Sequence, residues 1–330
     1  MSKSIPEIFK AFNDLQVLII GDVMLDSYIW GAVERVSPEA PVPIVSVRKR
    51  DVRLGGAANV ALNVQALGAK PVLCALIGDD DAGRKLLQNM DERGISKEGI
   101  VISAERPTTV KTRVIASHQH VVRVDEESDA VASTSEQKKL LEKIEKLLPA
   151  CQVVIFEDYD KGVLTTSIIE KSVALANKLG IPTVVDPKKR NFLSYKNVTL
   201  FKPNLKELRE GLKMEVDAAN QQQVASAVES LKAKLHAKGI LVTLSEHGAY
   251  IDFENQKIKL PAHIREIADV SGAGDTVVSI AAVCVALKLD PKLIVSLSNL
   301  GGGLVCQYVG VVPIDKEEFE KEALEIFQKD

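Results

Sequence analysis

The chain has 330 residues, of which 46% are hydrophobic and 26% are charged, a composition typical of a globular protein with a large buried core. Its net charge of −3 gives no general attraction to nucleic acid or to an anionic membrane. No apolar run has the length of a membrane span or a signal sequence, and the four cysteines form no Cys-x-x-Cys pair, so we expect a cytoplasmic protein with free thiols.

Short apolar runs alternate with segments of helical period along most of the chain. In chain order, the patterns predict strands at 15–20, 72–77, 152–156, 182–185, 198–201 and 240–244. They predict helices at 57–67, 83–93, 166–179, 205–212 and 224–237. This alternation indicates an α/β fold with a mostly parallel sheet, helices on both faces, and ligands beyond the carboxyl ends of the strands.

Two segments, 28–50 and 109–125, interrupt this order. They alternate apolar and polar residues, which predicts a small antiparallel sheet with one solvated face, packed beside a single domain that spans 1–330. Such a sheet serves as a lid or as a dimer contact, and an exposed apolar face favours covering by a second copy, hence a homodimer. His118 and His120 in this region lack the cluster that a metal site needs.

The segment 269–276 carries the strongest functional signal. Gly272, Ala273 and Gly274 precede Asp275 and an apolar helix, so the free N–H groups of the first helical turn are open to an anion such as phosphate. A carboxylate beside that anion is useful if it accepts the proton of an attacking hydroxyl, which indicates a phosphotransferase. The alternative is that Ser271 or Asp275 simply caps a core helix.

Three motifs in order, 55–59 (Gly-Gly-Ala-Ala-Asn), 203–207 (Pro-Asn-Leu-Lys-Glu) and 272–275 (Gly-Ala-Gly-Asp), resemble those of the ribokinase-like (PfkB) carbohydrate kinases across essentially the whole chain. More narrowly, segments 21–26, 35–43 and 107–113 resemble the kinase half of bacterial ADP-heptose synthesis enzymes. That resemblance implies ATP-dependent phosphorylation of D-glycero-β-D-manno-heptose 7-phosphate at C1. Some relatives carry a nucleotidyltransferase domain behind the kinase, whereas this chain stops at Asp330, so we expect a stand-alone kinase.

The resemblance also implies roles for individual residues. Asp275 is the catalytic base, and the amides of Ala273, Gly274 and Asp275 stabilise the transferring phosphoryl group. The expected sugar-binding residues are Asp26, Gly55, Gly56, Asn59 and Asp158. The expected substrate-phosphate ligands are Lys111 and Arg113, with Arg123 and Lys161 behind them, unless these cations only form a solvated strand face.

ATP and Mg²⁺ are the implied cofactors, and a monovalent cation is left open. Asn204 and Glu207 match the family's Asn-x-x-Glu, with Glu207 holding Mg²⁺ through water, although the pair also suits an ordinary helix start. The expected nucleotide-binding residues are Thr243, Ser245, Gly248 and Asn299.

Two departures from the family pattern are visible in the sequence. Glu157 stands where the family often has Ser before Asp-Tyr, and Ser245 replaces a frequent glycine. Two further functions stay open: a PfkB-type kinase for ribose, fructose or fructose 6-phosphate, and a non-catalytic regulator that binds a sugar phosphate.

Overall fold

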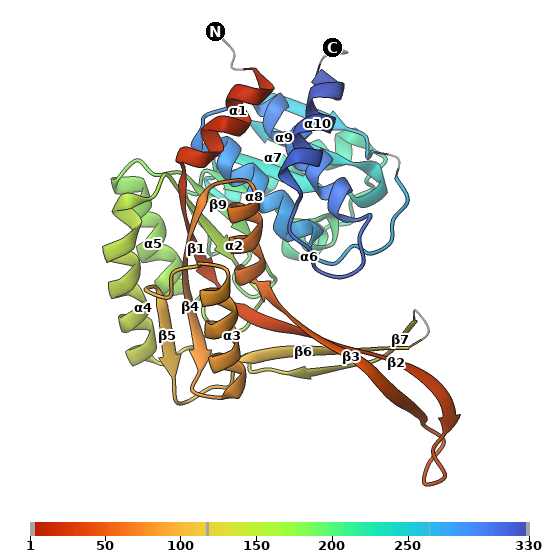
Figure 1. The fold of residues 1–330 in the computed structure, drawn as a ribbon. Coiled ribbons are helices and arrows are strands. Elements are labelled where there is room, and N and C mark those ends of the chain that lie inside the picture. The colour runs from red at the N-terminus through yellow and green to blue at the C-terminus, as the bar shows by residue number, and fades with distance from the viewer. Residues whose placement is uncertain (1–3, 117–118, 264, 328–330) are drawn as a thin grey trace.

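The computed structural model describes residues 4–116, 119–263 and 265–327, and its centre is a nine-stranded sheet (Figure 1). The strand order is β13-β12-β11-β10-β9-β8-β1-β4-β5. Seven strands are parallel: β1 (Gln16–Gly21), β4 (Lys70–Gly78), β5 (Ile100–Ser103), β8 (Val153–Glu157), β9 (Thr183–Asp186), β10 (Leu200–Phe201) and β11 (Gly239–Thr243). An antiparallel hairpin of β12 (Ala249–Phe253) and β13 (Gln256–Leu260) forms one edge.

Helices cover both faces of this sheet, as the alternating pattern predicts. One face carries α1 (Ile5–Ala11), α2 (Ala57–Ala66), α3 (Asp81–Glu92), α8 (Ala273–Ala286), α9 (Pro291–Val305) and α10 (Lys316–Phe327). The other carries α4 (Thr134–Leu147), α5 (Thr166–Lys178), α6 (Leu205–Leu212) and α7 (Gln221–Leu235). Short 3₁₀ turns lie at Phe12–Asp14, Leu148–Ala150 and Ser245–His247. The main sheet therefore has the expected α/β architecture, with helices on both of its faces.

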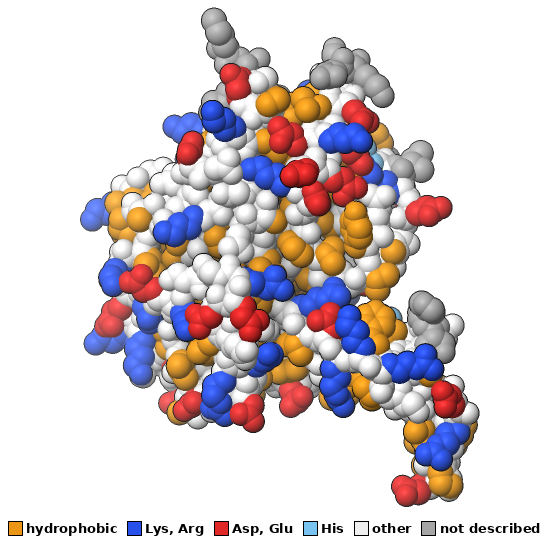
Figure 2. All heavy atoms as spheres, viewed as in Figure 1, with side chains coloured by type: hydrophobic (Ala, Val, Ile, Leu, Met, Phe, Trp, Pro, Cys, Tyr) orange, Lys and Arg blue, Asp and Glu red, His pale blue; other side chains and the backbone are white. Residues whose placement is uncertain are grey.

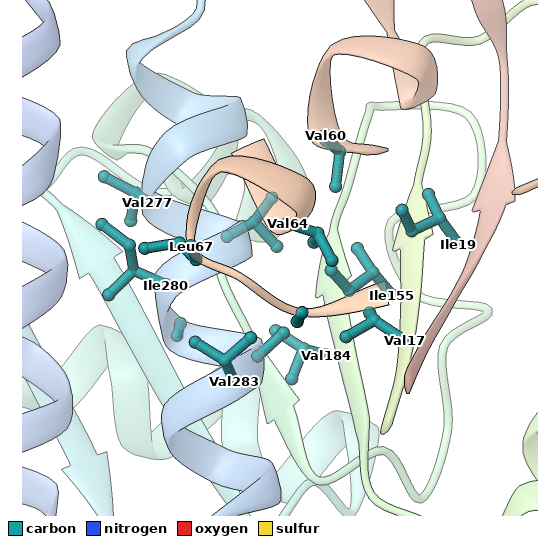
Figure 3. Close-up of a cluster of buried hydrophobic side chains, with 14 of the residues drawn as sticks. Val17, Ile19, Val60, Val64, Leu67, Ile155, Val184, Val277, Ile280 and Val283 are labelled. Carbon is teal, nitrogen blue, oxygen red and sulfur yellow. The ribbon is translucent and has the colours of Figure 1, made fainter. Parts of the chain in front are cut away.

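The period-2 geometry of the strands divides the core between the two faces. In β1, Val17 and Ile19 pack on the side of α2 and α8, whereas Leu18 and Ile20 belong to the cluster on the opposite side. Figure 3 shows the first cluster, in which Val17 and Ile19 share a buried layer with side chains of α2 and α8. Helix α8, which follows the glycine motif 272–274, is therefore anchored by burial along most of its length.

A second sheet of four strands projects from the body (Figure 1). It contains β2 (Val23–Val36), β3 (Pro43–Gly56), β6 (Thr109–Ala116) and β7 (Gln119–Glu126) in the order β3-β2-β6-β7. We call it the lid sheet. Most of the predicted segments 28–50 and 109–125 lies in these strands, but β2 starts closer to the body, at Val23, and β3 continues back to Gly56.

The expectation of a wholly antiparallel lid is wrong. The hairpins β2–β3 and β6–β7 are antiparallel, whereas the central pair β2–β6 is parallel. Both central strands leave the body shortly after a strand of the main sheet, β2 after β1 and β6 after β5, and both run outward. Their common direction makes them parallel. Within the described ranges, no helix is both long and apolar enough to span a bilayer.

Candidate active site

The N-terminus of α8 is open toward a crevice, as the glycine pattern predicts. Gly272 precedes the helix with φ = 81°, a left-handed conformation that a side chain would strain. The amides of Gly274 and Asp275 donate to no carbonyl in the described part of the chain. The Ala273 amide, by contrast, donates to Val270 O at 3.3 Å. Two of the three expected amides are therefore available to an anion, and Ala273 already has an acceptor within the turn.

Asp275 lies in this first turn and is 4% exposed. Asn59 Nδ2 donates to its Oδ2 at 2.6 Å, and the Tyr159 hydroxyl donates to its Oδ1 at 2.8 Å. Burial raises the pKa of Asp275 to about 6, while the two hydrogen bonds act in the opposite direction. The carboxylate is thus mostly ionised at neutral pH and basic enough to accept a proton.

Charged residues gather beneath α8, at the carboxyl ends of β8, β9 and β10. Asp186 Oδ2 pairs with Lys202 Nζ at 2.7 Å, and both side chains are buried. Glu157 is 1% exposed, and its Oε2 has no hydrogen-bond partner among the described residues. Burial, followed by the charges of Asp186 and Asp275, raises the pKa of Glu157 well above its ordinary value. This environment therefore favours the neutral form of the Glu157 carboxyl.

Two adjoining cavities form a crevice along this end of the sheet. A cavity of about 550 Å³ contains Asp275, Gly274, Tyr159 and the lysines 188, 202 and 206. A second cavity of about 430 Å³ is lined by the four expected nucleotide-binding residues, Thr243, Ser245, Gly248 and Asn299, together with apolar side chains. The cavities share Thr243, Ser245, Val270 and Gly274. One elongated ligand can therefore reach from the apolar cavity to Asp275.

Asn204 and Glu207 form a capping box at the start of α6. Asn204 Oδ1 accepts the Glu207 amide at 2.9 Å, and Glu207 Oε2 accepts the Asn204 amide at 2.9 Å. Glu207 Oε1 also pairs with Lys188 Nζ at 2.6 Å, and Lys188 and Asn204 both line the larger cavity. Asn204 and Glu207 therefore do cap the start of a helix, as the alternative interpretation expects. The same arrangement also places the pair beside the cavity.

The residues expected at the sugar lie at the junction of the lid and the body. Asp26 forms a buried ion pair with Arg113, and a Cβ on Gly55 would overlap the Asp26 carboxylate. Lys111 Nζ lies 5.7 Å from the centre of the Tyr159 ring and forms no ion pair within the described ranges. Gly56 has φ = 58° at the start of α2, which places Asn59 in the first turn of that helix, facing Asp275.

Two further cations were expected behind Lys111 and Arg113. Arg123 pairs with Asp125, and Lys161 pairs with Glu127. His118 lies outside the described residues, and His120 is exposed on β7.

The structure does not bring Asp158 into the crevice. Its Oδ2 accepts hydrogen bonds from Tyr195 OH at 2.7 Å and Asn191 Nδ2 at 3.1 Å, among buried residues of the opposite face. The expected sugar contact is therefore corrected: Asp158 and Tyr159 are adjacent along the chain, and only Tyr159 points toward Asp275.

Several residues of the crevice had no predicted role, among them Tyr159, Asp186, Lys188 and Lys202. A signal for them was present in the sequence, because each follows or ends a buried strand. Polar residues at the carboxyl ends of parallel strands meet at one edge of the sheet, where α/β proteins bind ligands.

Comparison with known proteins identifies the family of this chain. The profile of the pfkB family carbohydrate kinases matches residues 14–317, so the chain belongs to this family of carbohydrate kinases. It is 37% identical, over 93% of its length, to the bifunctional protein HldE of Rhodopseudomonas palustris (strain BisA53). It is 42% identical, over 94% of its length, to the bifunctional protein HldE of Caulobacter vibrioides. The chain spans 63% and 64% of the lengths of these two relatives.

Solved structures share the fold at low sequence identity. Phosphofructokinase-2 from Escherichia coli in complex with potassium superposes with a TM-score of 0.77 at 19% identity, covering 93% of this chain and 97% of that one. Ribokinase from Arabidopsis thaliana, complexed with ribose and ATP, gives a TM-score of 0.71 at 18% identity, covering 93% and 99% of the two chains.

Proposed function

We propose that this chain is a cytoplasmic kinase that transfers the γ-phosphoryl group of ATP to the C1 hydroxyl of D-glycero-β-D-manno-heptose 7-phosphate, giving the 1,7-bisphosphate. The observation that carries the proposal is the buried Asp275 carboxylate at the open N-terminus of α8, beside two free amides. The heptose is inferred from segments 21–26, 35–43 and 107–113, and from the similarity to bifunctional HldE proteins.

The chemistry follows from this geometry. The sugar oxygen attacks the γ-phosphorus, its proton passes to Asp275, and the bond from phosphorus to the β,γ-bridging oxygen breaks to release ADP. Negative charge spreads over the equatorial phosphoryl oxygens, where the Gly274 and Asp275 amides and the positive end of the helix dipole stabilise it. Lys202 and Lys188 line the same cavity, where each is paired with a carboxylate, that of Asp186 and that of Glu207 respectively.

The cavities fit a magnesium nucleotide. The apolar cavity suits adenine, with Asn299, Ser245 and Thr243 as polar contacts at its wall. The described residues contain no group of three or more carboxylates, histidines or cysteines that could hold a metal by themselves. Mg²⁺ commonly keeps several waters and binds mainly through substrate phosphates, so Glu207 and Asn204 at the cavity edge are suitable outer ligands. When bound, Mg²⁺ neutralises phosphate charge.

The substrate phosphate requires fixed cations on the sugar side. Lys111 is half-buried, and this burial lowers its pKa because the ammonium group loses solvation. A substrate phosphate beside Lys111 would supply the negative charge that stabilises the ammonium form. Arg113 is already paired with Asp26, which orients both groups at the edge of the sugar site. We propose that Lys111 contacts the 7-phosphate and that Arg113 sets the position of Asp26 against the sugar hydroxyls.

We further propose that two copies associate through the lid sheet. The projecting sheet exposes Val36 (63%), Val42 (52%), Val47 (47%), Val122 (49%) and Val124 (49%). Figure 2 shows hydrophobic side chains on its tip, away from the body. A partner's sheet would cover these valines and stiffen a long hairpin that has little contact with its own body.

A substrate panel tests the proposed reaction. ADP release is measured with ATP, Mg²⁺ and each of heptose 7-phosphate, fructose 6-phosphate, ribose and fructose. We expect turnover mainly with the heptose phosphate. Asp275→Asn should retain binding of both substrates in calorimetry and lose turnover by at least about 10³-fold, because the base is removed. Comparable rates on the unphosphorylated sugars would reject the heptose assignment, and an inactive wild type that binds sugar phosphate would favour the regulator.

A further inference from the structure

The hydroxyl of Tyr159 is hydrogen-bonded to the carboxylate that acts as base in the proposed function. It donates to Asp275 Oδ1 at 2.8 Å, while Asn59 Nδ2 donates to Oδ2 at 2.6 Å. A carboxylate has roughly four lone-pair directions, and two of them are used here. The carboxylate is therefore held at both oxygens and retains lone pairs for a third donor, the sugar hydroxyl.

We propose that Tyr159 is a positioning residue for the base: its hydroxyl fixes the Asp275 carboxylate so that a remaining lone pair faces the acceptor hydroxyl beside the free amides of α8. This inference rests on the proposed function. A single hydrogen bond from Asn59 would leave the carboxylate free to rotate about its terminal torsion, which is soft in Asp. The second donor, on the other oxygen, removes that freedom.

The backbone around Tyr159 is itself held rigidly. The buried Asp22 carboxylate, just after β1, accepts the Tyr159 amide at 2.8 Å, the Lys161 amide at 3.1 Å and the Val163 amide at 3.1 Å. Asp22 also donates its own amide to Glu157 O at 3.1 Å. The loop after β8 is thus tied to the end of β1, so the phenol reaches Asp275 from a fixed point. This support is what a positioning residue needs.

The ring of Tyr159 lies close to two cationic side chains. Lys111 Nζ is 5.7 Å and Lys188 Nζ is 5.4 Å from the ring centre. Both contacts depend on the aromatic face and not on the hydroxyl. The variant Tyr159→Phe therefore keeps the ring, its packing and both cation contacts, and deletes only the hydrogen bond to Asp275.

The chain supplies a matched control. Tyr195 is buried, and like Tyr159 it donates its hydroxyl to a buried carboxylate, that of Asp158 at 2.7 Å, on the opposite face of the sheet. Tyr195→Phe removes the same kind of bond at a site that touches neither cavity. Any general cost of losing a buried tyrosine hydroxyl should appear in both variants.

The pH dependence of activity is the first readout. Charged and titratable groups that act on Asp275 or Tyr159 come from β8 (Glu157), β9 (Asp186), the segment after β9 (Lys188), the segment after β10 (Lys202) and β6 (Lys111). None of them changes in Tyr159→Phe. Loss of a hydrogen bond to the ionised form should move the acid limb of kcat/KM upward by about one pH unit. We expect kcat to fall about tenfold on the plateau, since the base is less well oriented, with KM for the sugar within about twofold.

The second readout does not require turnover. Carboxyl ¹³C shifts of labelled free enzyme, with the Asp275 signal identified by its absence in Asp275→Asn, report the pKa of that carboxylate directly. We expect the pKa of Asp275 to rise in Tyr159→Phe and to stay at the wild-type value in Tyr195→Phe. An inactive wild type would count against the proposed function and leave this measurement intact.

Two results would overturn the inference. One is an Asp275 pKa and pH profile that do not move in Tyr159→Phe. The other is a loss of activity of equal size in Tyr159→Phe and Tyr195→Phe, which would assign both hydroxyls a structural role only. Near-ultraviolet circular dichroism and the melting temperature of each variant verify that it is folded.

Discussion

The environment of Asp275 determines how the reaction should respond to pH. Burial raises the pKa of this carboxyl to about 6, and only the ionised form can accept a proton from the sugar. We therefore predict that kcat/KM is constant above about pH 7 and falls tenfold per pH unit well below pH 6. Initial rates of ADP release between pH 5 and 9 measure this profile. A limb centred near pH 4 would show that Asp275 is not the titrating base.

The buried carboxyl group of Glu157 makes the stability of the protein depend on pH. Its pKa is raised above the unfolded-state value, so the contribution to stability is fully present below about pH 4.5 and is lost as pH rises toward the folded pKa. The Glu157→Gln variant has no titrating carboxyl at this position, so it does not lose stability in this way as pH rises. We predict that the variant matches wild type near pH 4 and becomes more stable than wild type at higher pH, by up to about 1.4 kcal/mol per pH unit.

Urea unfolding at several pH values measures this difference. Glu142→Gln, at an exposed position of α4, is the control and should follow wild type throughout. A Glu157→Gln variant whose stability relative to wild type is the same at every pH would mean that Glu157 is ionised in the folded protein.

The start of helix α6 combines a structural and a catalytic role. Asn204→Ala removes the cap of the Glu207 amide and should lower the free energy of unfolding by about 1 kcal/mol. It should also raise KM for MgATP, because Asn204 lines the cavity. Ser133→Ala at the start of α4 removes an equivalent capping box from a residue that lines neither cavity. It should cost similar stability and leave KM for MgATP unchanged.

Denaturant titration and the dependence of the initial rate on MgATP concentration separate the two roles of this helix start. Equal KM values in the two cap variants would limit Asn204 to helix capping.

At the scale of the whole molecule, the lid sheet is the part that we propose to contact a second copy of the chain. We predict that Val36→Asp combined with Val42→Asp converts a dimer into a monomer, because two charges would be buried in the apolar contact. Light scattering after size exclusion measures the mass. Leu179→Asp, at the end of α5 and outside the lid, is the control for an exposed apolar residue. A wild-type monomer at micromolar concentration would contradict the proposed interface.

Most of the main fold could be predicted because its signals are local. The predicted helix 205–212 coincides with α6, and most other predicted elements differ from the structure by a few residues at their ends. β10 is shorter than predicted, with only Leu200 and Phe201 in the ladder. The short edge strands β5 and β13 were not predicted, since an edge strand needs little apolar periodicity of its own, and the strand β12 that joins β13 to the sheet was also not predicted.

The candidate site was partly predictable for the same reason. A glycine-opened helix with Asp275 in its first turn, and the Asn-x-x-Glu start of α6, each lie within a few consecutive residues, and backbone geometry alone gives them their form. Of the four nucleotide-side residues, Thr243, Ser245 and Gly248 lie at or just after the end of β11, whereas Asn299 lies within α9, and all four line one cavity.

What the amino-acid order alone determined, then, is the alternation of strand and helix and the chemistry at the mouth of α8, because both depend on neighbours along the chain. Only the tertiary structure decided that Asn59 and Tyr159, 216 and 116 residues away, hold the two oxygens of Asp275. It also decided that Asp158 faces the opposite side and that β2 and β6 run parallel. These features depend on which strand ends meet and which way each side chain points, and packing over long sequence separations sets both.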